Sequence, residues 1–522
     1  MVFLSKAVFL LGVSLFALAS SAGAQSTGSL YTSETVTLSV EEARILALEY
    51  NKNILVAGHN STAETAKALA ERAAFDPVFE LSGAYNKTSE PSDSSFISGG
   101  IKSERLSASS GITGQLPSGG YYDLFRFTLS RDKNESPIQS LSPAYSSSLD
   151  MRVGQNLLRD FGAKGARAKI TAQSLRSDIG KLSLTVETAR TLLDVERKYW
   201  DVVAAVRNYE LGRRNLELGV DLLERNRVMV KEGVLPRLEE MKAESAVAAR
   251  RVELIEAEND LKGARDKLKN LTGLPLETVI ELTDAPETGI YTHTDSAELI
   301  ETAFEKRAEL KRAKKRLEMA ETEKNYRANQ RLPKLAVEGV VSLRGLAGRT
   351  NPSGFVFGDS PLARADLGTS LSDAVSTVAD RDFVSWGASI TMSVPIMNRY
   401  AGGLYRAATA EHNRSLAEYG RTKQLIALEV KAAADKLWSG YRRVEAATAA
   451  RNVAEEVLEA EKEKYAAGLS TTREVLEAQR DLVRARAERI RSAADYRSAL
   501  AALRHATGTI IEASGVLIEG RF

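Results

Sequence analysis

The sequence of 522 residues contains no cysteine. Disulfide scaffolds, thiolate metal sites, cysteine nucleophiles and a lipid-modified N-terminal cysteine are therefore excluded. Aromatic residues make up only 6% of the chain and there are only 12 prolines, whereas charged residues reach 27%. This composition, rich in Ala, Glu, Lys, Leu and Arg, is typical of long helices rather than of large compact cores.

An excess of charge of one sign is also missing. The 71 Lys and Arg residues nearly balance the 69 Asp and Glu residues, which leaves a net charge of +2 and gives no signal for a nucleic-acid partner. The four histidines show no metal-ligand spacing. The sequence has no glycine loop next to a Lys-Ser or Lys-Thr, and no serine in a nucleophile elbow. We therefore expect neither an enzyme nor a cofactor.

Residues 1–24 have the pattern of a secretory signal peptide. Lys6 supplies a positive charge, an apolar run of 13 residues extends from Ala7 to Ala19, and Ala22 to Ala24 fit a cleavage site before Gln25. A membrane anchor is the alternative, but such a run is too short to span about 30 Å of hydrocarbon. No later stretch approaches 18 apolar residues, so a mature chain that crossed a membrane would need strands closed into a barrel.

The rest of the chain shows two copies of one plan, a helix followed by a strand region and a long helical hairpin. Pro77 and Pro333, which end the first helix of each copy, lie 256 residues apart, and this spacing indicates a duplication. The first repeat, 25–284, is expected to contain a helix over 39–75, strands within 77–158 and a hairpin over 163–272. The second repeat, 285–522, is expected to contain a helix over 295–330, strands within 333–397, a hairpin over 403–507 and a tail over 508–522.

Apolar periodicity distinguishes the helices from the strands. Leu192, Val195, Tyr199 and Val203 recur at spacings of three and four, which predicts the buried face of a helix. About 65 residues of helix make a rod of about 100 Å. The strand regions instead alternate apolar and polar residues over about ten positions, most clearly in 384–394, which is the length of a tilted membrane strand. The edge of a soluble sheet would show the same alternation.

Two segments between the strands, 86–144 and 346–381, are rich in Gly and Ser and look like loops or hairpins. The first contains a possible strand, a Pro-Ser-Gly-Gly turn and a second strand that ends near Ser130. The sequence leaves open whether this extra hairpin extends a barrel or folds outside it.

Two glycine turns carry a resemblance to a known family. Gly233 and Gly468 lie 235 residues apart, as do Ala243 and Ala478. Together with other motifs in the same order, these turns resemble the helical-hairpin signature of the TolC family of outer-membrane efflux proteins. The matching segments are 233–244 (GVLPRLEEMKAE), 465–479 (YAAGLSTTREVLEAQ), the strand-to-helix junctions 153–162 and 394–403, and the linker 270–275.

The resemblance implies a mostly α fold with a transmembrane β part, assembled as a homotrimer. Each chain would give four strands to one twelve-stranded barrel in the outer membrane of a Gram-negative bacterium, and its helices to one periplasmic tunnel. The implied function is a passive exit duct for a tripartite efflux pump or a type I secretion system, with an adaptor protein, an inner-membrane pump and outer-membrane lipid as partners. A soluble periplasmic coiled-coil scaffold or binding protein without a pore is the alternative.

The resemblance also implies roles for residues near the second turn. Glu474 and Glu477 lie one helical turn apart, so three-fold symmetry would stack two carboxylate rings at the pore entrance, where they would attract cations. On the residues alone, a solvated surface helix explains them equally well. Tyr465 and Glu239 match positions that help to close the entrance. The family can carry an arginine where this chain has Ser470, and Arg473 is the nearby substitute.

The two turns themselves are the expected docking surface for an adaptor. Glycine ends a helix in the left-handed conformation at little cost, which explains Gly233 and Gly468 structurally. Exposed apolar residues beside the glycines would add a contact surface. The turn residues expected to dock are Gly233, Val234, Leu235, Gly468, Leu469 and Ser470.

Overall fold

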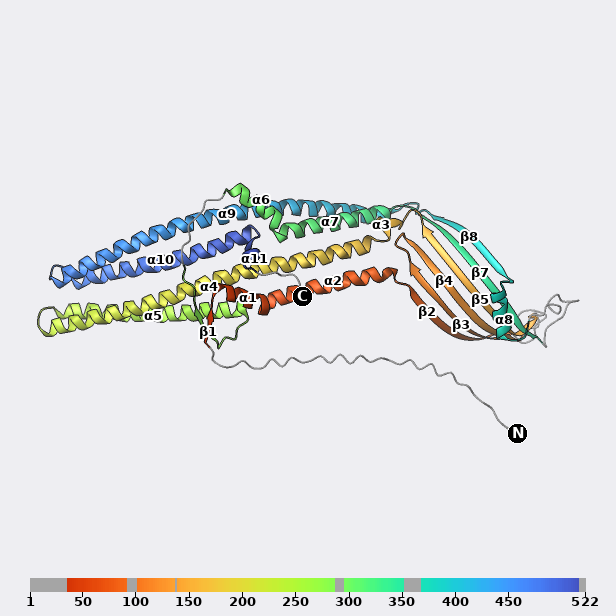
Figure 1. Ribbon diagram of the computed structural model, residues 1–522, viewed down its shortest axis with the longest axis horizontal. Coiled ribbons are helices and arrows are strands. Elements are labelled where there is room, and N and C mark those ends of the chain that lie inside the picture. The colour runs from red at the N-terminus through yellow and green to blue at the C-terminus, as the bar shows by residue number, and fades with distance from the viewer. Residues whose placement is uncertain (1–34, 92–100, 137–138, 287–294, 352–367, 516–522) are drawn as a thin grey trace, which may run out of the picture.

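The computed structural model describes residues 35–91, 101–136, 139–286, 295–351 and 368–515. The molecule is elongated, with a β-sheet at one end and two helical hairpins at the other (Figure 1). The expected signal peptide lies outside the described residues. Within those residues, no helix has the length and apolar character needed to cross a membrane.

Four helices of the described chain form one layer in the order α2, α4, α7, α9. Each of them is joined to a strand at the sheet end of the molecule (Figure 1). The stripe expected in the first long helix is buried, and Leu192, Val195 and Tyr199 of α4 are fully inaccessible. The mostly helical fold class with an added β part is confirmed. The bounds are α2 Lys52–Arg72, α4 Ala168–Lys231, α7 Ala308–Asn329 and α9 Arg399–Ala466.

Two of these helices fold back on themselves at the end far from the sheet. Helix α4 pairs with α5 (Arg237–Thr272), and α9 pairs with α10 (Thr472–Ala506). Helix α10 also contacts α4, so the two hairpins lie side by side (Figure 1). We call the end formed by the two hairpin turns, residues 224–240 and 461–477, the tip.

Short elements surround the middle of the long helices, and we call this region the belt. Strand β1 (Thr35–Leu38) pairs in parallel with β6 (Val279–Leu282), although 244 residues separate their first residues. Helices α1 (Val40–Tyr50), α6 (Ser296–Lys306) and α11 (Ile510–Ala513) complete the belt. Its core joins the two repeats, because Leu192 of α4 lies in one apolar cluster with Ala501 of α10 and Ile510 of α11.

The structure breaks each of the two shorter helices that the sequence analysis expected to be continuous. Asn51 separates α1 from α2, and Arg307 separates α6 from α7, both with extended backbones. The Asn51 side chain accepts a hydrogen bond from Asn53 N at 2.9 Å and donates one to Leu271 O at 2.9 Å. The Arg307 guanidinium is buried 3.0 Å from Glu429. Each break is thus fixed by a partner far away in the sequence.

The sheet contains six antiparallel strands within the described residues, in the order β2-β3-β4-β5-β7-β8. The expected number of four strands is wrong, because residues 101–134 form a hairpin inserted between β2 and β5. This hairpin extends the sheet of the single chain. The strands are β2 Val78–Glu90, β3 Ile101–Gln115, β4 Gly120–Asn134, β5 Leu141–Asn156, β7 Lys334–Thr350 and β8 Val384–Ser393.

Part of the segment 346–381 is a helix rather than a loop. Helix α8 (Leu371–Asp380) begins with a capping box between Ser370 and Asp373 and packs on β5 and β7. Ala374 is fully buried there, and its carbonyl accepts a hydrogen bond from Ser147 Oγ at 2.6 Å. Short turns of helix occur at the sheet junctions, η1 (Ala73–Phe75) and α3 (Gly162–Gly165).

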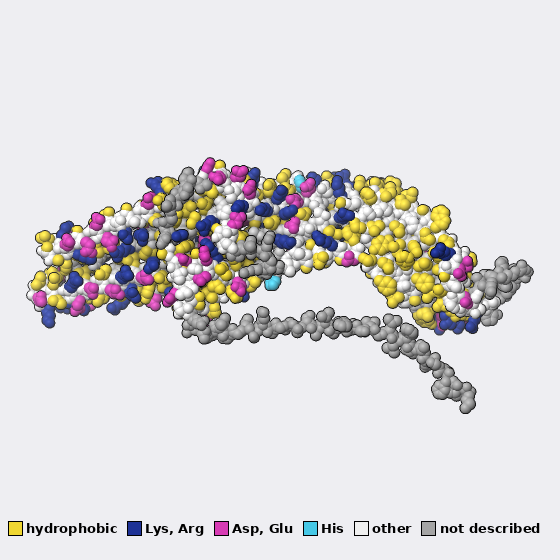
Figure 2. All heavy atoms as spheres, viewed as in Figure 1, with side chains coloured by type: hydrophobic (Ala, Val, Ile, Leu, Met, Phe, Trp, Pro, Cys, Tyr) yellow, Lys and Arg dark blue, Asp and Glu magenta, His cyan; other side chains and the backbone are white. Residues whose placement is uncertain are grey.

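The two faces of the sheet differ in chemistry. Apolar side chains cover one face, and Figure 2 shows them as a continuous surface over the strands. Trp386 is 82% exposed on this face. The opposite face carries hydroxyl groups and ion pairs, among them Arg105 with Asp132 at 2.6 Å and Arg126 with Glu80 at 2.9 Å. A sheet with one exposed apolar face needs a partner or a lipid environment.

Candidate functional site at the tip

Both turns at the tip depend on a glycine in the left-handed conformation. Gly233 has φ of 76° and Gly468 has φ of 73°. Their N–H groups donate to Val230 O and Tyr465 O, each at 3.1 Å. A Cβ added to either glycine would meet no other atom. Glycine is therefore required here for its backbone conformation and not for lack of space.

The apolar side chains at the two turns are not equally exposed. Val234 is 66% exposed and Leu469 is 80% exposed, as the sequence predicted. Leu235 was expected to be exposed too, but it is only half-buried, and its N–H donates to Met229 O at 3.2 Å. Leu238 and Met241, one turn further along α5, add exposed apolar surface that the sequence analysis did not identify.

Four residues form a hydrogen-bonded group that links all four helices at the tip, and we call it the tip network. Asn226 of α4 is fully buried and accepts a hydrogen bond from Tyr465 of α9, OH to Oδ1, at 3.0 Å. The Asn226 amide donates to Glu239 O of α5 at 3.2 Å and to Thr472 Oγ1 of α10 at 3.3 Å. The structure thus brings together Tyr465 and Glu239, which the sequence analysis singled out.

The sequence analysis did not identify Asn226 and Thr472 as site residues. The sequence did contain a sign of a buried polar contact at Asn226. This residue follows Leu222 and Leu223 on the buried face of α4 and interrupts an apolar stripe. A polar residue in such a position needs partners, because a buried amide without hydrogen bonds costs about 1–3 kcal/mol.

The Glu239 side chain has its own contacts in the tip. Its Oε1 pairs with Lys242 Nζ at 2.6 Å, and this hydrogen bond lowers the pKa of Glu239 below its usual value. The second oxygen, Oε2, is buried and has no hydrogen-bond partner among the described residues. Glu239 is therefore ionised at neutral pH.

The two acidic residues predicted at the pore entrance are both exposed on α10, but they differ in their contacts. Glu474 Oε2 accepts hydrogen bonds from Thr471 N at 2.7 Å and Ser470 Oγ at 2.8 Å, which completes a capping box. The bond from the Thr471 backbone is the main reason why the pKa of Glu474 is lowered. Glu474 thus stabilises its own turn, whatever role its charge has. Glu477 lies one turn further along the same helix.

Ser470, at the position where the family can carry an arginine, makes polar contacts of its own. Its Oγ lies 2.9 Å from Glu461 as well as beside Glu474, so it sits between two carboxylates. Arg473 is exposed on α10, and no ion pair of this residue is found in the described part of the chain. The structure of one chain therefore does not bring Arg473 to the network.

A buried arginine joins the hairpins above the tip network. Arg250 of α5 donates to Gln479 Oε1 of α10 at 2.7 Å and to Asn215 O of α4 at 2.9 Å. Gly219 makes room for it, since a Cβ there would lie 2.6 Å from Arg250 Nη1. Burial lowers the pKa of Arg250. The sequence analysis missed this contact, because its partners lie 35 and 229 residues away.

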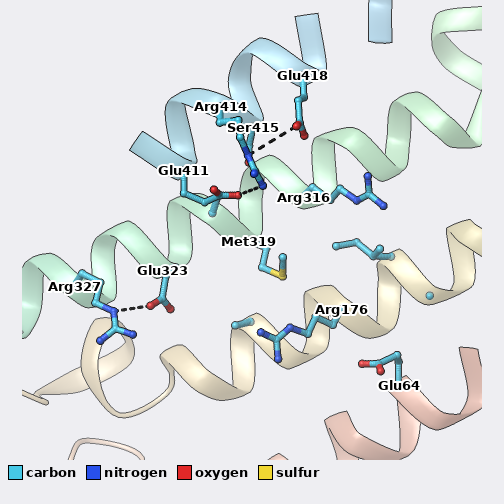
Figure 3. A pocket seen from close by; sticks show the side chains of 14 residues that line it. Glu64, Arg176, Arg316, Met319, Glu323, Arg327, Glu411, Arg414, Ser415 and Glu418 are labelled. Atoms are coloured by element: carbon cyan, nitrogen blue, oxygen red, sulfur yellow. Dashed lines mark hydrogen bonds and ion pairs between the residues drawn. The ribbon is translucent and has the colours of Figure 1, made fainter. Parts of the chain in front are cut away.

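A groove of 890 Å³ lies in the helix layer between α2, α4, α7 and α9 (Figure 3). It is lined by four arginines and four glutamates. Several of these charges are paired, as in Arg414 with Glu411 at 2.5 Å and Arg327 with Glu323 at 2.6 Å (Figure 3). Such a balanced set of charges gives no preference for an ion of either sign.

Comparison with known proteins supports the resemblance drawn from the sequence. Residues 299–509 match the model of the outer membrane efflux protein family. This match confirms the resemblance in the second repeat. Comparison with curated proteins returns no match.

Several solved structures share the fold over most of the chain. The Campylobacter jejuni CmeC outer membrane channel superposes with a TM-score of 0.64 at 13% identity, over 90% of this chain and 86% of that one. The outer membrane protein VceC of Vibrio cholerae superposes with a TM-score of 0.63 at 15% identity, over 90% of this chain and 96% of that one. The Neisseria gonorrhoeae MtrE outer membrane channel superposes with a TM-score of 0.62 at 15% identity, over 90% of this chain and 89% of that one.

These similarities bear on the alternatives left by the sequence. The family match and the shared fold support the outer-membrane efflux duct and do not favour the soluble scaffold. The outer membrane, which is the location expected from the sequence, is also the location named for the matching family and for these channels. The family is one of efflux channels rather than of enzymes.

Proposed function

We propose that this protein is the outer-membrane exit duct of a tripartite efflux pump and acts as a homotrimer without catalytic activity. The observation that carries the proposal is the direct continuation of the helix layer into a sheet with one apolar and one polar face. A wall of this kind separates lipid from a polar passage. Its two edge strands, β2 and β8, leave backbone groups unpaired, which lipid cannot satisfy.

The tip is the gate in this proposal. The tip network holds the two hairpins of one chain together, and a duct that opens must separate them or tilt them as a pair. Only a few polar contacts hold the hairpins at this level, which suits a reversible opening. Glu474 and Glu477 would form acidic rings at the entrance of the closed trimer and favour cations.

Val234 and Leu469 supply the apolar centre of the docking surface for a periplasmic adaptor. Val234 lies in the turn between α4 and α5, and Leu469 lies in the turn between α9 and α10. Both turns are at the end of the molecule away from the sheet (Figure 1). An inner-membrane pump would be reached through that adaptor. A carboxylate introduced at the centre of such a contact would be desolvated without a partner, which costs several kcal/mol.

Extraction and assembly test the duct itself. Isolated membranes should retain the protein through urea and carbonate washes, and detergent should release a trimer. Complete extraction as a monomer would instead support the soluble scaffold.

Export by cells that contain the cognate pump tests the docking surface. Leu469→Asp should abolish export while the trimer still forms, and Leu469→Met serves as the matched apolar control. Normal export by Leu469→Asp would exclude this turn as the docking surface.

A further inference from the structure

The inserted hairpin β3–β4 has the same two faces as the rest of the sheet. In β3, Ala108 pairs with Gly83 of β2 and Leu129 of β4, and all three lie on the apolar face. The next residue, Ser109, pairs with Ser82 and Thr128 on the polar face. The hairpin therefore continues both surfaces without a break, as strands of a membrane wall do.

Ion pairs on the polar face tie the hairpin to its neighbours. Arg126 of β4 pairs with Glu80 of β2 across β3 at 2.9 Å, and with Asp123 at 2.7 Å. Tyr121 of β4 donates a hydrogen bond to Glu338 of β7 across β5. These contacts span strands that are not adjacent, so the hairpin is held inside the sheet from both sides.

The hairpin also makes the sheet as wide as the helix layer above it. Four helices packed about 9 Å apart span roughly 36 Å. Six strands about 4.8 Å apart, tilted by about 40° as in membrane barrels, span roughly 38 Å along the same perimeter. Four strands would span only roughly 25 Å by the same estimate. By this estimate, the six-stranded sheet spans about the width of the helix layer.

The two edges of the sheet are suited to each other. Every residue of β2 and of β8 is exposed in the single chain. Strand β2 leaves the helix layer and β8 returns to it, so the β8 edge of one copy can pair antiparallel with the β2 edge of the next. Both edges carry apolar residues on the same face of the sheet, Phe79 and Leu81 on β2 and Trp386 and Ile390 on β8.

We propose that three copies of this chain close an eighteen-stranded barrel, in which the β3–β4 hairpin forms part of the wall. The proposal rests on the proposed function and replaces the twelve strands expected from the family resemblance. Because barrel diameter grows roughly in proportion to strand number, the outlet is about 1.5 times as wide as a twelve-stranded one.

Cysteine labelling can test this proposal cleanly, because the chain has no cysteine of its own. Ser107→Cys and Ala108→Cys place a thiol on the polar and apolar faces of β3, and Ser389→Cys and Ala388→Cys do the same on β8. A membrane-impermeant maleimide is added to whole cells that express each full-length variant. We expect strong labelling at 107 and 389 and at least tenfold weaker labelling at 108 and 388.

The β8 pair separates failure of this proposal from failure of the duct. If 388 and 389 differ but 107 and 108 label equally, the chain lines a membrane wall and the hairpin lies outside it, which overturns the proposal. If neither pair differs, both the duct and the eighteen-stranded barrel are wrong. Electron microscopy of the unmodified trimer gives an independent count, and twelve strands instead of eighteen would overturn the proposal even if labelling alternated.

Discussion

The belt and the tip lie on the same long helices but are held together differently. In the belt, apolar clusters cross between the repeats, as where Leu192 meets Ala501 and Ile510. Directly next to the tip, the apolar clusters stay within one hairpin. Leu223 packs with Ala243 and Val247 in the first, and the second has a separate cluster of Leu458, Ala478 and Leu482.

The belt and the tip also differ in the polar contacts that hold them together. The belt contains an ion pair between Arg44 and Glu196 at 2.9 Å, with side chains only 9% and 5% exposed. It also buries Tyr199, whose OH donates to Asp284 at 2.7 Å, and burial raises the pKa of this tyrosine. The tip instead joins its hairpins through hydrogen bonds between mostly neutral groups, each worth about 1 kcal/mol net. The comparison suggests that the belt is permanent and that the tip can open while the belt stays folded.

The largest expected effect comes from breaking the belt. Glu196→Ala leaves Arg44 buried without its carboxylate, and removing one partner of such a pair costs about 3–5 kcal/mol. The denaturation midpoint of the purified trimer should fall strongly. Glu196→Gln, which keeps one hydrogen-bond acceptor, should lose less. A Glu196→Ala trimer with unchanged stability would show that the buried pair does not hold the belt.

The second prediction opens the tip. Asn226→Leu has similar volume but removes the hydrogen bonds to Tyr465, Thr472 and the Glu239 carbonyl. The closed tip should lose about 1–3 kcal/mol, which corresponds to an increase of about fivefold to about 150-fold in the open population. Conductance in planar bilayers should rise accordingly, whereas the denaturation midpoint should change little. Tyr465→Phe, which removes one hydroxyl, is the graded control and should give a smaller rise.

If conductance rises in Glu196→Ala but not in Asn226→Leu, the roles of the belt and the tip are the reverse of those inferred here. The belt would then be the gate and the tip a fixed structure. Equal conductance in Asn226→Leu and the unmodified protein would remove the tip network from the gate altogether.

The sequence predicted the long helices well and the polar contacts between them poorly. The stripe from Leu192 to Val203 is a local pattern, and it is visible because it repeats over many turns. The breaks at Asn51 and Arg307 escaped notice because their causes are Leu271 and Glu429, more than 100 residues away. The same holds for the tip network, in which Asn226 lies 239 residues from Tyr465.

The inserted hairpin was difficult to recognise for a different reason. Strand β3 presents Ser103, Ser107 and Ser109 to the polar face and small residues such as Ala108 to the apolar face. Its alternation is therefore weak in hydrophobicity, as is usual for strands that line a polar passage. A Ser- and Gly-rich composition then looks like a loop, although the register with β2 and β4 is regular over most of its length.

The third prediction concerns pH at the tip. The pKa values of Glu239 and Glu474 are both lowered from the usual 4.5, so the folded tip favours their ionised forms. The stability that they contribute is fully present above pH 4.5 and is lost as the pH falls through the lowered values. The closed state should therefore loosen below pH 4.5, and bilayer conductance should rise there. Glu474→Gln should weaken this response, and a response that is unchanged in both Glu474→Gln and Glu239→Gln would assign it to other groups.

The smallest expected effect compares the two glycine turns. Gly233→Ala and Gly468→Ala both place a Cβ on a residue with φ above 70°, which costs about 1 kcal/mol, and neither Cβ meets another atom. The two variants should therefore lower the stability of the tip by similar amounts. Hydrogen exchange of the turn amides should quicken in both, while amides in the belt should exchange as in the unmodified protein. Asn tolerates the left-handed conformation better than Ala, so Gly468→Asn should quicken exchange less than Gly468→Ala. If protection in the belt falls together with that of the turns, the two regions unfold as one unit and the tip cannot open independently.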